Sequence, residues 1–166
     1  MNLQDALASG IQALGLDLPA GTPERLDAFA RLLIKWNKVY NLTAVRDPQE
    51  MLTHHLLDSL AAVPPLRRHI AQAGLAATPV RLLDVGSGGG LPGVVFAICC
   101  PGVDVSCVDT VAKKAAFIQQ AAAALRLPNL HGIHARVESL AGPFDVVSCR
   151  AFASLQDFTA WSRSAL

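Results

Sequence analysis

The residues best placed to do chemistry lie near the middle of the chain, where Asp84 precedes a glycine-rich stretch, Gly86-Ser-Gly-Gly-Gly-Leu-Pro-Gly93. The short apolar run before the glycines, Leu82, Leu83 and Val85, is typical of a strand buried on both faces. Glycines let a backbone approach a ligand closely, and a helix that begins after them points free N–H groups at it. Pro92 suits the first turn of such a helix. The stretch therefore predicts a strand, a turn that binds a ligand, and a helix.

The spacing of the glycines narrows the class of ligand. A phosphate-binding loop of the Walker type needs a lysine directly after its last glycine, and the next lysine here is Lys113. A dinucleotide fingerprint that starts at Gly86 and Gly88 has Leu91 where its third glycine belongs, which disfavours an NAD-dependent oxidoreductase. The spacing Gly-x-Gly-x-Gly after Asp84 fits a ligand with cationic groups and no pyrophosphate, and S-adenosylmethionine is such a ligand. A glycine turn without a ligand is the alternative.

The candidate cofactor site comprises the residues that follow four predicted strands, because ligands of doubly wound sheets bind outside the carboxyl ends of the strands. These residues are Asp84, Gly86, Ser87 and Gly88 after the first strand, Asp109 after the second, Arg136, Val137 and Glu138 after the third, and Ser148, Cys149 and Arg150 after the fourth. Their convergence on one rim of the sheet is what favours a site.

Several of these side chains have a plainer alternative role. Asp109 lies about twenty residues past the glycines, where a carboxylate accepts hydrogen bonds from ribose hydroxyls, but it can equally cap the following helix. Arg136, Val137 and Glu138 are placed to frame an adenine, although Glu138 can be an ordinary surface acid. Arg136 and Arg150 are the candidates for positioning RNA or substrate, since planar guanidinium groups suit phosphates and guanine edges. Arg150 can instead pair with a carboxylate elsewhere.

The elements that must position these residues follow from hydrophobic periodicity and turn signals. We expect helices over residues 2–14, 23–39, 48–63 and 66–73, and then strands over 81–85, 103–108, 130–135 and 144–148 that alternate with helices over 91–99, 113–126 and 155–166. Thr22, Asp47 and Ser154 are the predicted N-caps, and Pro64-Pro65 is expected to close the third helix. Alternation with short connections predicts an α/β fold with a parallel sheet of about four strands. We expect a helical region over 1–78 and a Rossmann-like core over 79–166, with the boundary near Thr78.

A basic stripe of Arg31, Lys35 and Lys38 lies on the helix over residues 23–39, opposite its apolar face. One interpretation is contact with RNA phosphates. The favoured interpretation is a solvated face on which Asp27 and Arg31 form an i,i+4 ion pair.

Neither the histidines nor the cysteines have the spacing of a metal site. His54 and His55 are adjacent and would point about 100° apart on a helix, so we expect one core and one surface histidine rather than a shared ligand. The four cysteines have no C-x-x-C spacing and lie in or at the end of apolar runs. We expect small buried hydrophobes in a reducing compartment, no disulfide and no bound metal.

Composition excludes several classes of protein. The 166 residues are 52% hydrophobic and 16% charged, which excludes a disordered chain and supports a sizeable core. A net charge of +1 argues weakly against a surface devoted mainly to nucleic acid. The amino terminus has no basic region of a secretory signal, and no apolar run reaches the length of a membrane span. These features predict a cytoplasmic protein without a membrane, and we expect a monomer.

Five longer stretches resemble one known family, the bacterial ribosomal RNA small subunit methyltransferase G, or glucose-inhibited division protein B, family. They are Trp36-Asn-Lys-Val-Tyr-Asn-Leu-Thr-Ala-Val-Arg46-Asp-Pro48, His55-Leu-Leu-Asp58-Ser59, Asp84-Val-Gly-Ser-Gly-Gly-Gly-Leu-Pro-Gly93, Arg136-Val-Glu138 and Ser148-Cys-Arg-Ala-Phe-Ala153. The first and last of these are much more specific than the glycine stretch, and the resemblance covers most of the chain from residue 26 onward.

The resemblance implies the fold and the reaction. It implies a class I S-adenosylmethionine-dependent methyltransferase with an N-terminal helical subdomain, which methylates guanine N7 in the 530-loop decoding region of 16S rRNA. The implied partners are 16S rRNA and the 30S ribosomal subunit. The implied cofactor contacts are at the positions that match the family's motifs, Gly86, Leu91, Val137, Glu138 and Arg150.

The implied chemistry needs no general base, because guanine N7 carries a free lone pair and no proton. Alignment of that lone pair with the sulfonium methyl group is what the enzyme must supply. A nucleophilic role for Cys149 is disfavoured, because the sequence shows no activating base beside it.

The resemblance also predicts further strands beyond the fourth, whereas the sequence stops at Leu166. We therefore expect a C-terminally shortened sheet, with the fourth strand at an uncovered edge and reduced stability. The alternative to an active enzyme is then a catalytically impaired fragment that still binds the cofactor or RNA.

Overall fold

The computed structural model describes residues 3–75, 79–150 and 153–166. The helical first part comprises α1 (Leu3–Ala13), α2 (Thr22–Tyr40), α3 (Pro48–Glu50), the π-helix η1 (Met51–Leu57), α4 (Asp58–Ala61) and α5 (Val63–Gln72). The second part comprises β1 (Val80–Val85), α6 (Gly93–Cys99), β2 (Val103–Asp109), α7 (Ala112–Ala124), β3 (Leu130–His134), the 3-10 turn η3 (Val137–Ser139), β4 (Val146–Cys149), α8 (Leu155–Ser162) and the 3-10 turn η4 (Arg163–Ala165).

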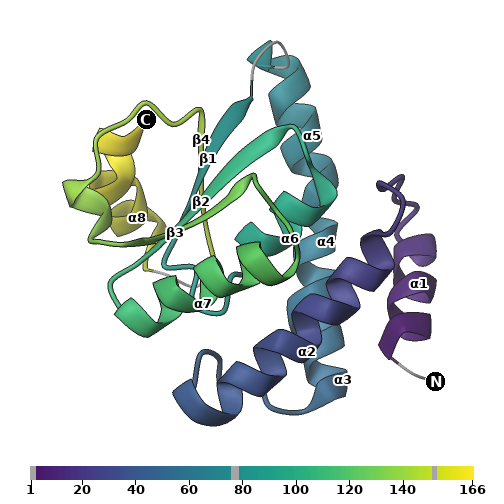
Figure 1. The fold of residues 1–166 in the computed structure, drawn as a ribbon. Coiled ribbons are helices and arrows are strands. Elements are labelled where there is room, and N and C mark those ends of the chain that lie inside the picture. The colour runs from purple at the N-terminus through teal and green to yellow at the C-terminus, as the bar shows by residue number, and fades with distance from the viewer. Residues whose placement is uncertain (1–2, 76–78, 151–152) are drawn as a thin grey trace.

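The strands form one parallel sheet in the order β3-β2-β1-β4, which confirms the predicted α/β class (Figure 1). β1 and β2 pair from Val80 opposite Val103 to Val85 opposite Val108. β4 pairs with β1 alone among the described strands and so lies at an edge. The carboxyl ends of all four strands therefore meet at one rim, where the predicted site residues lie.

Side chains of β1 alternate between two hydrophobic layers, as expected for a strand buried on both faces. Leu82 belongs to the larger cluster, which contains α6, α7 and the helical first part. Leu83 and Val85 point to the smaller cluster, where Phe144 and Ala165 pack from the C-terminal part of the chain. Helices thus cover both faces of the sheet, with α6 and α7 on one side and α8 on the other (Figure 1).

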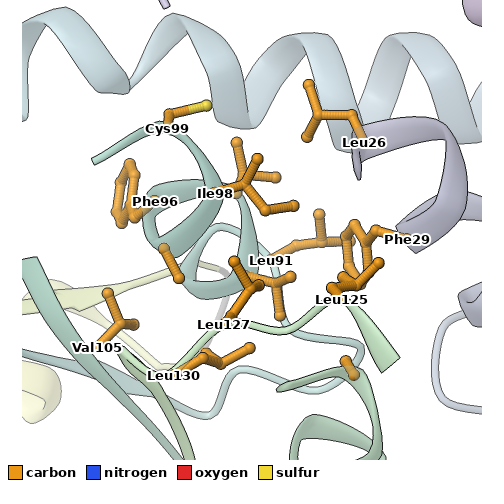
Figure 2. Close-up of a cluster of buried hydrophobic side chains, with 14 of the residues drawn as sticks. Leu26, Phe29, Leu91, Phe96, Ile98, Cys99, Val105, Leu125, Leu127 and Leu130 are labelled. Atoms are coloured by element: carbon orange, nitrogen blue, oxygen red, sulfur yellow. The ribbon is translucent and has the colours of Figure 1, made fainter. Parts of the chain in front are cut away.

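The helical first part shares its hydrophobic core with the sheet. Leu26 and Phe29 of α2 are fully buried and belong to the same cluster as Ile98 of α6 and Leu127 (Figure 2). The Phe29 and Phe117 ring centroids lie 6.3 Å apart. The predicted division at residues 78 and 79 stays a prediction, since Thr78 lies outside the described residues and the core is continuous across it.

Two of the three predicted helix caps are present. Asp47 Oδ1 accepts hydrogen bonds from the backbone N–H of Gln49 and Glu50, and Ser154 Oγ accepts one from Asp157. The Thr22 cap is wrong. Gly21, in the left-handed conformation, takes the cap position of α2, and the Thr22 hydroxyl donates to the Pro19 carbonyl.

The predicted third helix differs from the structure in two ways. Its middle is the π-helix η1, whose wider turn the 3.6-residue spacing does not reveal. Its last part, α4, ends at Ala61, before the prolines, and Pro64-Pro65 lie within the first turn of α5. Proline is tolerated there because first-turn N–H groups have no partner within the helix.

Two further expectations concern the cysteines and the basic stripe of α2. Cys99, Cys100 and Cys107 are buried, as predicted, and burial raises the pKa of the Cys99 thiol to about 12. The prediction is wrong for Cys149, which is only half-buried at the end of the edge strand β4. Arg31 and Asp27 form the expected ion pair at 2.8 Å. Within the described residues, none of the helices is both long enough and apolar enough to span a bilayer.

Candidate cofactor site

The glycine turn has the left-handed backbone that its composition predicts. Gly86 has φ of 63° and Gly88 has φ of 54°, values that residues with a Cβ rarely adopt. The Gly86 N–H donates to the Val108 carbonyl at 2.9 Å, so the turn begins as a continuation of the β1–β2 ladder. The chain then curls back, with the Gly90 N–H donating to the Ser87 carbonyl at 2.8 Å.

A cavity of about 510 Å³ lies beside this turn, at the carboxyl ends of β1, β2 and β3. Its size falls within the roughly 300–1,000 Å³ of small-molecule sites. Five predicted site residues line it: Gly86, Asp109, Arg136, Val137 and Glu138. Val85 and Val108 add an apolar wall. Three strands therefore bring carboxylates, a guanidinium, aliphatic side chains and a Cβ-free backbone to one hollow.

Asp109 combines a structural role with a place at the cavity. Its Oδ1 accepts a hydrogen bond from the Val111 N–H at 2.9 Å, and its Oδ2 accepts one from the Gly88 N–H at 3.1 Å. The N-cap of α7 is Val111, so Asp109 holds the preceding turn rather than capping the helix itself. Each carboxylate oxygen has further lone pairs, which leaves capacity to accept from a ribose hydroxyl.

The residues after β3 form a short 3-10 turn, which places their side chains in different environments. Val137 is buried, whereas Arg136 and Glu138 are exposed at the cavity. The Ser139 hydroxyl donates to the Arg136 carbonyl at 2.7 Å and closes the turn. The turn therefore presents one apolar and two charged groups side by side.

Besides Arg150, four predicted cofactor contacts do not line this cavity: Asp84, Ser87, Gly88 and Leu91. Asp84 is fully buried, and its Oδ2 accepts from the Gly93 N–H at 2.9 Å while its Oδ1 accepts from the Ser148 hydroxyl at 3.0 Å. Burial raises the pKa of Asp84 to about 7, although these two hydrogen bonds act in the opposite direction. Asp84 thus joins β1, β4 and α6, and its direct contact with a cofactor stays a prediction, as do those of the other three.

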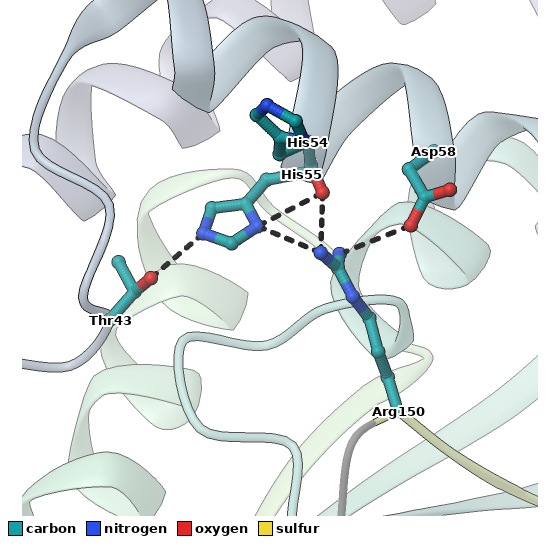
Figure 3. A network of polar contacts seen from close by, with 5 residues as sticks. All are labelled: Thr43, His54, His55, Asp58 and Arg150. Carbon is teal, nitrogen blue, oxygen red and sulfur yellow. Dashed lines mark hydrogen bonds and ion pairs between the residues drawn. The ribbon is translucent and has the colours of Figure 1, made fainter.

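Arg150 points away from the cavity, toward η1 (Figure 3). Its Nη2 donates to the His54 carbonyl and lies 3.2 Å from His55 Nδ1, and its Nη1 lies 3.7 Å from Asp58 Oδ2. The plainer alternative, pairing with a carboxylate elsewhere, is therefore present. The predicted cofactor and substrate contacts of Arg150 stay predictions. Ala151 and Phe152, which follow in the family motif, lie outside the described residues.

His55 is half-buried at the centre of this network rather than part of the hydrophobic core, whereas His54 is exposed. Its Nε2 lies 2.7 Å from Thr43 Oγ1. Burial, and next the nearby Arg150 guanidinium, lower the pKa of His55. A neutral ring accepts from Arg150 at Nδ1 and donates to Thr43 at Nε2, so one side chain connects the segment after α2, η1 and the end of β4 (Figure 3).

Replacing Arg150 with alanine is expected to lower the free energy of unfolding by about 1–2 kcal/mol, because the His54 carbonyl and His55 lose a donor. Arg150→Lys should recover only part of this lost stability, because one ammonium group cannot reproduce the several donors of a planar guanidinium group. Urea unfolding midpoints measure the effect. Arg31→Ala, which breaks an exposed ion pair, is the control and should leave the unfolding midpoint almost unchanged, because exposed ion pairs add little to stability. Equal losses for the two alanine variants would contradict the proposed connection.

Besides Val85, Val108 and Ala135, which were predicted only as strand residues, sequence reasoning missed four residues of the cavity: Thr110, Val111, Lys114 and Trp161. The first three of these four lie within five residues after Asp109 and could have been found by extending the strand-end rule into the first turn of α7. Trp161 lies in α8, far from any strand end in the sequence. Only the folding of α8 onto the sheet brings it to the cavity (Figure 1).

Comparisons of the sequence with family models and with known proteins indicate the same family. A family model described as rRNA small subunit methyltransferase G matches residues 22–166. Proteins named ribosomal RNA small subunit methyltransferase G are 78% identical in Acidovorax sp. (strain JS42), over 99% of this chain and 74% of that protein, and 55% identical in Leptothrix cholodnii, over 98% and 73%. This chain thus spans about three quarters of the length of these relatives.

The arrangement of helices and strands is also found in a solved methyltransferase. Coclaurine N-methyltransferase, whose crystal structure holds N-methylheliamine and SAH, superposes with a TM-score of 0.51 at 15% identity. The match covers 98% of this chain and 53% of that one, so this chain spans about half of that protein. A likeness at this identity concerns the fold alone.

Proposed function

The chain belongs to the rRNA small subunit methyltransferase G family, and from this we propose that it transfers a methyl group from S-adenosylmethionine to N7 of a guanine in 16S rRNA. The finer target, the 530-loop decoding region, is part of the proposal. The observation that carries it is the cavity at the carboxyl ends of β1, β2 and β3, where a left-handed Gly86 meets the carboxylates of Asp109 and Glu138.

The residues of the cavity fit S-adenosylmethionine. Gly86 has no Cβ and lets the ligand approach the backbone, as nucleoside sites require. Asp109 and Glu138 supply acceptors for ribose hydroxyls, and Val85, Val108 and Val137 supply an apolar surface for a base. When bound, the cofactor supplies an electrophilic sulfonium methyl group. What the chain contributes is binding and alignment, since guanine N7 needs no deprotonation.

Basic side chains beside the cavity support RNA as the substrate. Arg136 and Lys114 line the cavity, and Lys113 is exposed one residue before Lys114. The α2 stripe of Arg31, Lys35 and Lys38 is also exposed. We include contact of these groups with rRNA phosphates in the proposal, because such contacts hold an RNA in position without reading its sequence.

Two measurements test the proposed reaction. Calorimetric titration with S-adenosylhomocysteine tests the cofactor, and NAD should not compete with it. Transfer of a radiolabelled methyl group to 30S subunits that lack the modification, with naked 16S rRNA in parallel, tests the reaction and its substrate. Binding without transfer would favour the alternative, a catalytically impaired chain that retains the cofactor site. Absence of both would overturn the proposal.

Glu138→Gln is expected to weaken S-adenosylhomocysteine binding about tenfold, because a hydrogen bond to a carboxylate is stronger than one to an amide. The unfolding midpoint should not change, since Glu138 is exposed and no described hydrogen bond depends on its side chain. Glu24→Gln, on exposed α2 surface, is the matched control and should leave the dissociation constant unchanged. An equal dissociation constant for both variants would remove Glu138 from the site.

A further inference from the structure

We infer that Trp161 of α8 forms a wall of the cofactor cavity and stacks on the adenine of the bound nucleoside. The inference deepens the proposed function and depends on it. Neither the strand-end rule nor the family motifs single out this residue. Trp161 is the only aromatic side chain among the described residues that line the cavity.

Trp161 is one of the exposed residues of α8. α8 is anchored to the smaller hydrophobic cluster by the half-buried Phe158 and is followed by the buried Ser162 and Ala165. Trp161 itself keeps 42% of its surface exposed. Trp161 also lines the cavity, so a ligand there would remove apolar surface from water.

The chemistry of the cavity favours a flat heterocycle beside this indole. Val137 and Trp161 both line the hollow, and their helical turns, η3 and α8, pack against each other. An aliphatic and an aromatic surface in one hollow suit the two faces of a purine ring. Asp109 and Glu138 lie in the same hollow with acceptors for the ribose. A base attached to that ribose is thereby directed to Val137 and Trp161.

Adenine rather than the target guanine is the base assigned to Trp161. Base–aromatic stacking tolerates any base, so the position of the cavity in the fold must distinguish adenine from guanine. The hollow is formed by the turns after β1, β2 and β3, where nucleoside cofactors of α/β sheets bind. Binding of S-adenosylhomocysteine in the absence of RNA separates these two occupants directly.

Intrinsic fluorescence provides the first test, because the chain has two tryptophans. In Trp36→Phe the emission comes from Trp161 alone, and Trp36 lies beside Phe117 and Tyr40, away from the cavity. S-adenosylhomocysteine and adenosine should both change the intensity or wavelength of this emission to saturation, whereas homocysteine, which has no base, should not. A saturating calorimetric signal without any change in emission would overturn the inference.

Calorimetry on three variants of Trp161 provides the second test. Trp161→Ala should weaken S-adenosylhomocysteine binding about tenfold or more, Trp161→Leu should also weaken it because bulk without a π-face does not stack, and Trp161→Phe should stay within about threefold of the wild type. Circular dichroism and urea midpoints identify any variant that fails to fold. Wild-type affinity in folded Trp161→Leu would overturn the stacking role while leaving the proposed function intact. Absence of binding to the wild-type chain would overturn both.

Discussion

Replacing Gly93 with alanine is expected to lower the free energy of unfolding by about 3 kcal/mol, at the upper end of the usual cost of overpacking a core. A Cβ at this position would lie 2.4 Å from Cys107 Sγ and 2.7 Å from Asp84 Oδ2. Both neighbours belong to the central strands, which cannot easily move apart. The first turn of α6 would have to shift outward, and the hydrogen bond from the Gly93 N–H to Asp84 would lengthen with it.

Gly102→Ala is the matched control for this prediction. No atom lies within 4 Å of a Cβ built at Gly102, so the substitution should change stability by no more than about 0.5 kcal/mol. Urea unfolding curves of both variants measure the difference. Adding Cys107→Ala to Gly93→Ala removes the nearest atom and should restore part of the loss relative to the sum of the single variants. Additive effects would show that the clash with Cys107 is not the cause.

The sheet and most helices could be predicted from the sequence because their signals are local. Leu82, Leu83 and Val85 form a short apolar run, as a strand buried on both faces requires, and β1 has this burial. Asp47 and Ser154 cap helices because each accepts from backbone N–H groups two or three residues ahead. Thr22 has the same local pattern, yet Gly21 adopts the left-handed conformation and takes the cap position. The choice between two neighbouring cap positions depends on the direction from which the preceding segment of the chain enters the helix.

The parts of the site that could not be predicted depend on where side chains point after the chain has folded. The strand-end rule placed Asp84 and Arg150 on the correct rim, but it does not give their direction. Asp84 turns inward under α6, and Arg150 reaches back to η1, a segment nearly one hundred residues earlier in the chain. For Trp161 the error is the reverse: it belongs to no motif and was not predicted, yet tertiary packing brings it to the cavity. Residue type and spacing therefore predicted the rim of the sheet at which the cavity lies better than they predicted which side chains line it.

Removing the Asp84 carboxyl is the second substitution for which we expect a large effect. Asp84→Ala leaves the Gly93 N–H and the Ser148 hydroxyl without their acceptor, and each unpaired buried donor costs about 1–3 kcal/mol. We expect a loss of about 3–4 kcal/mol below pH 6, where the buried carboxyl is protonated. Asp84→Asn should retain the fold, because its amide oxygen accepts from Gly93 and its amide nitrogen donates to the Ser148 oxygen. Chemical denaturation of the three proteins at pH 5.5 tests this order.

The pH dependence of the same three proteins distinguishes a buried neutral carboxyl from a charged one. The pKa of Asp84 is about 7 in the folded state against 3.8 for the free side chain, so the native protein binds more protons than the unfolded chain between about pH 4 and pH 7. Stability from this group is therefore present at low pH and is lost as the pH rises, with a slope of up to about 1.4 kcal/mol per pH unit. Other titrating groups, His55 among them, cancel when the wild type is compared with Asp84→Asn at each pH. The difference between their free energies of unfolding should fall from pH 4 to pH 7 and level off above pH 8, where Asp84→Asn should be the more stable protein. A difference that is constant with pH, or that favours the wild type at pH 8, would mean that Asp84 is charged in the fold, as a direct partner of a cationic cofactor would have to be.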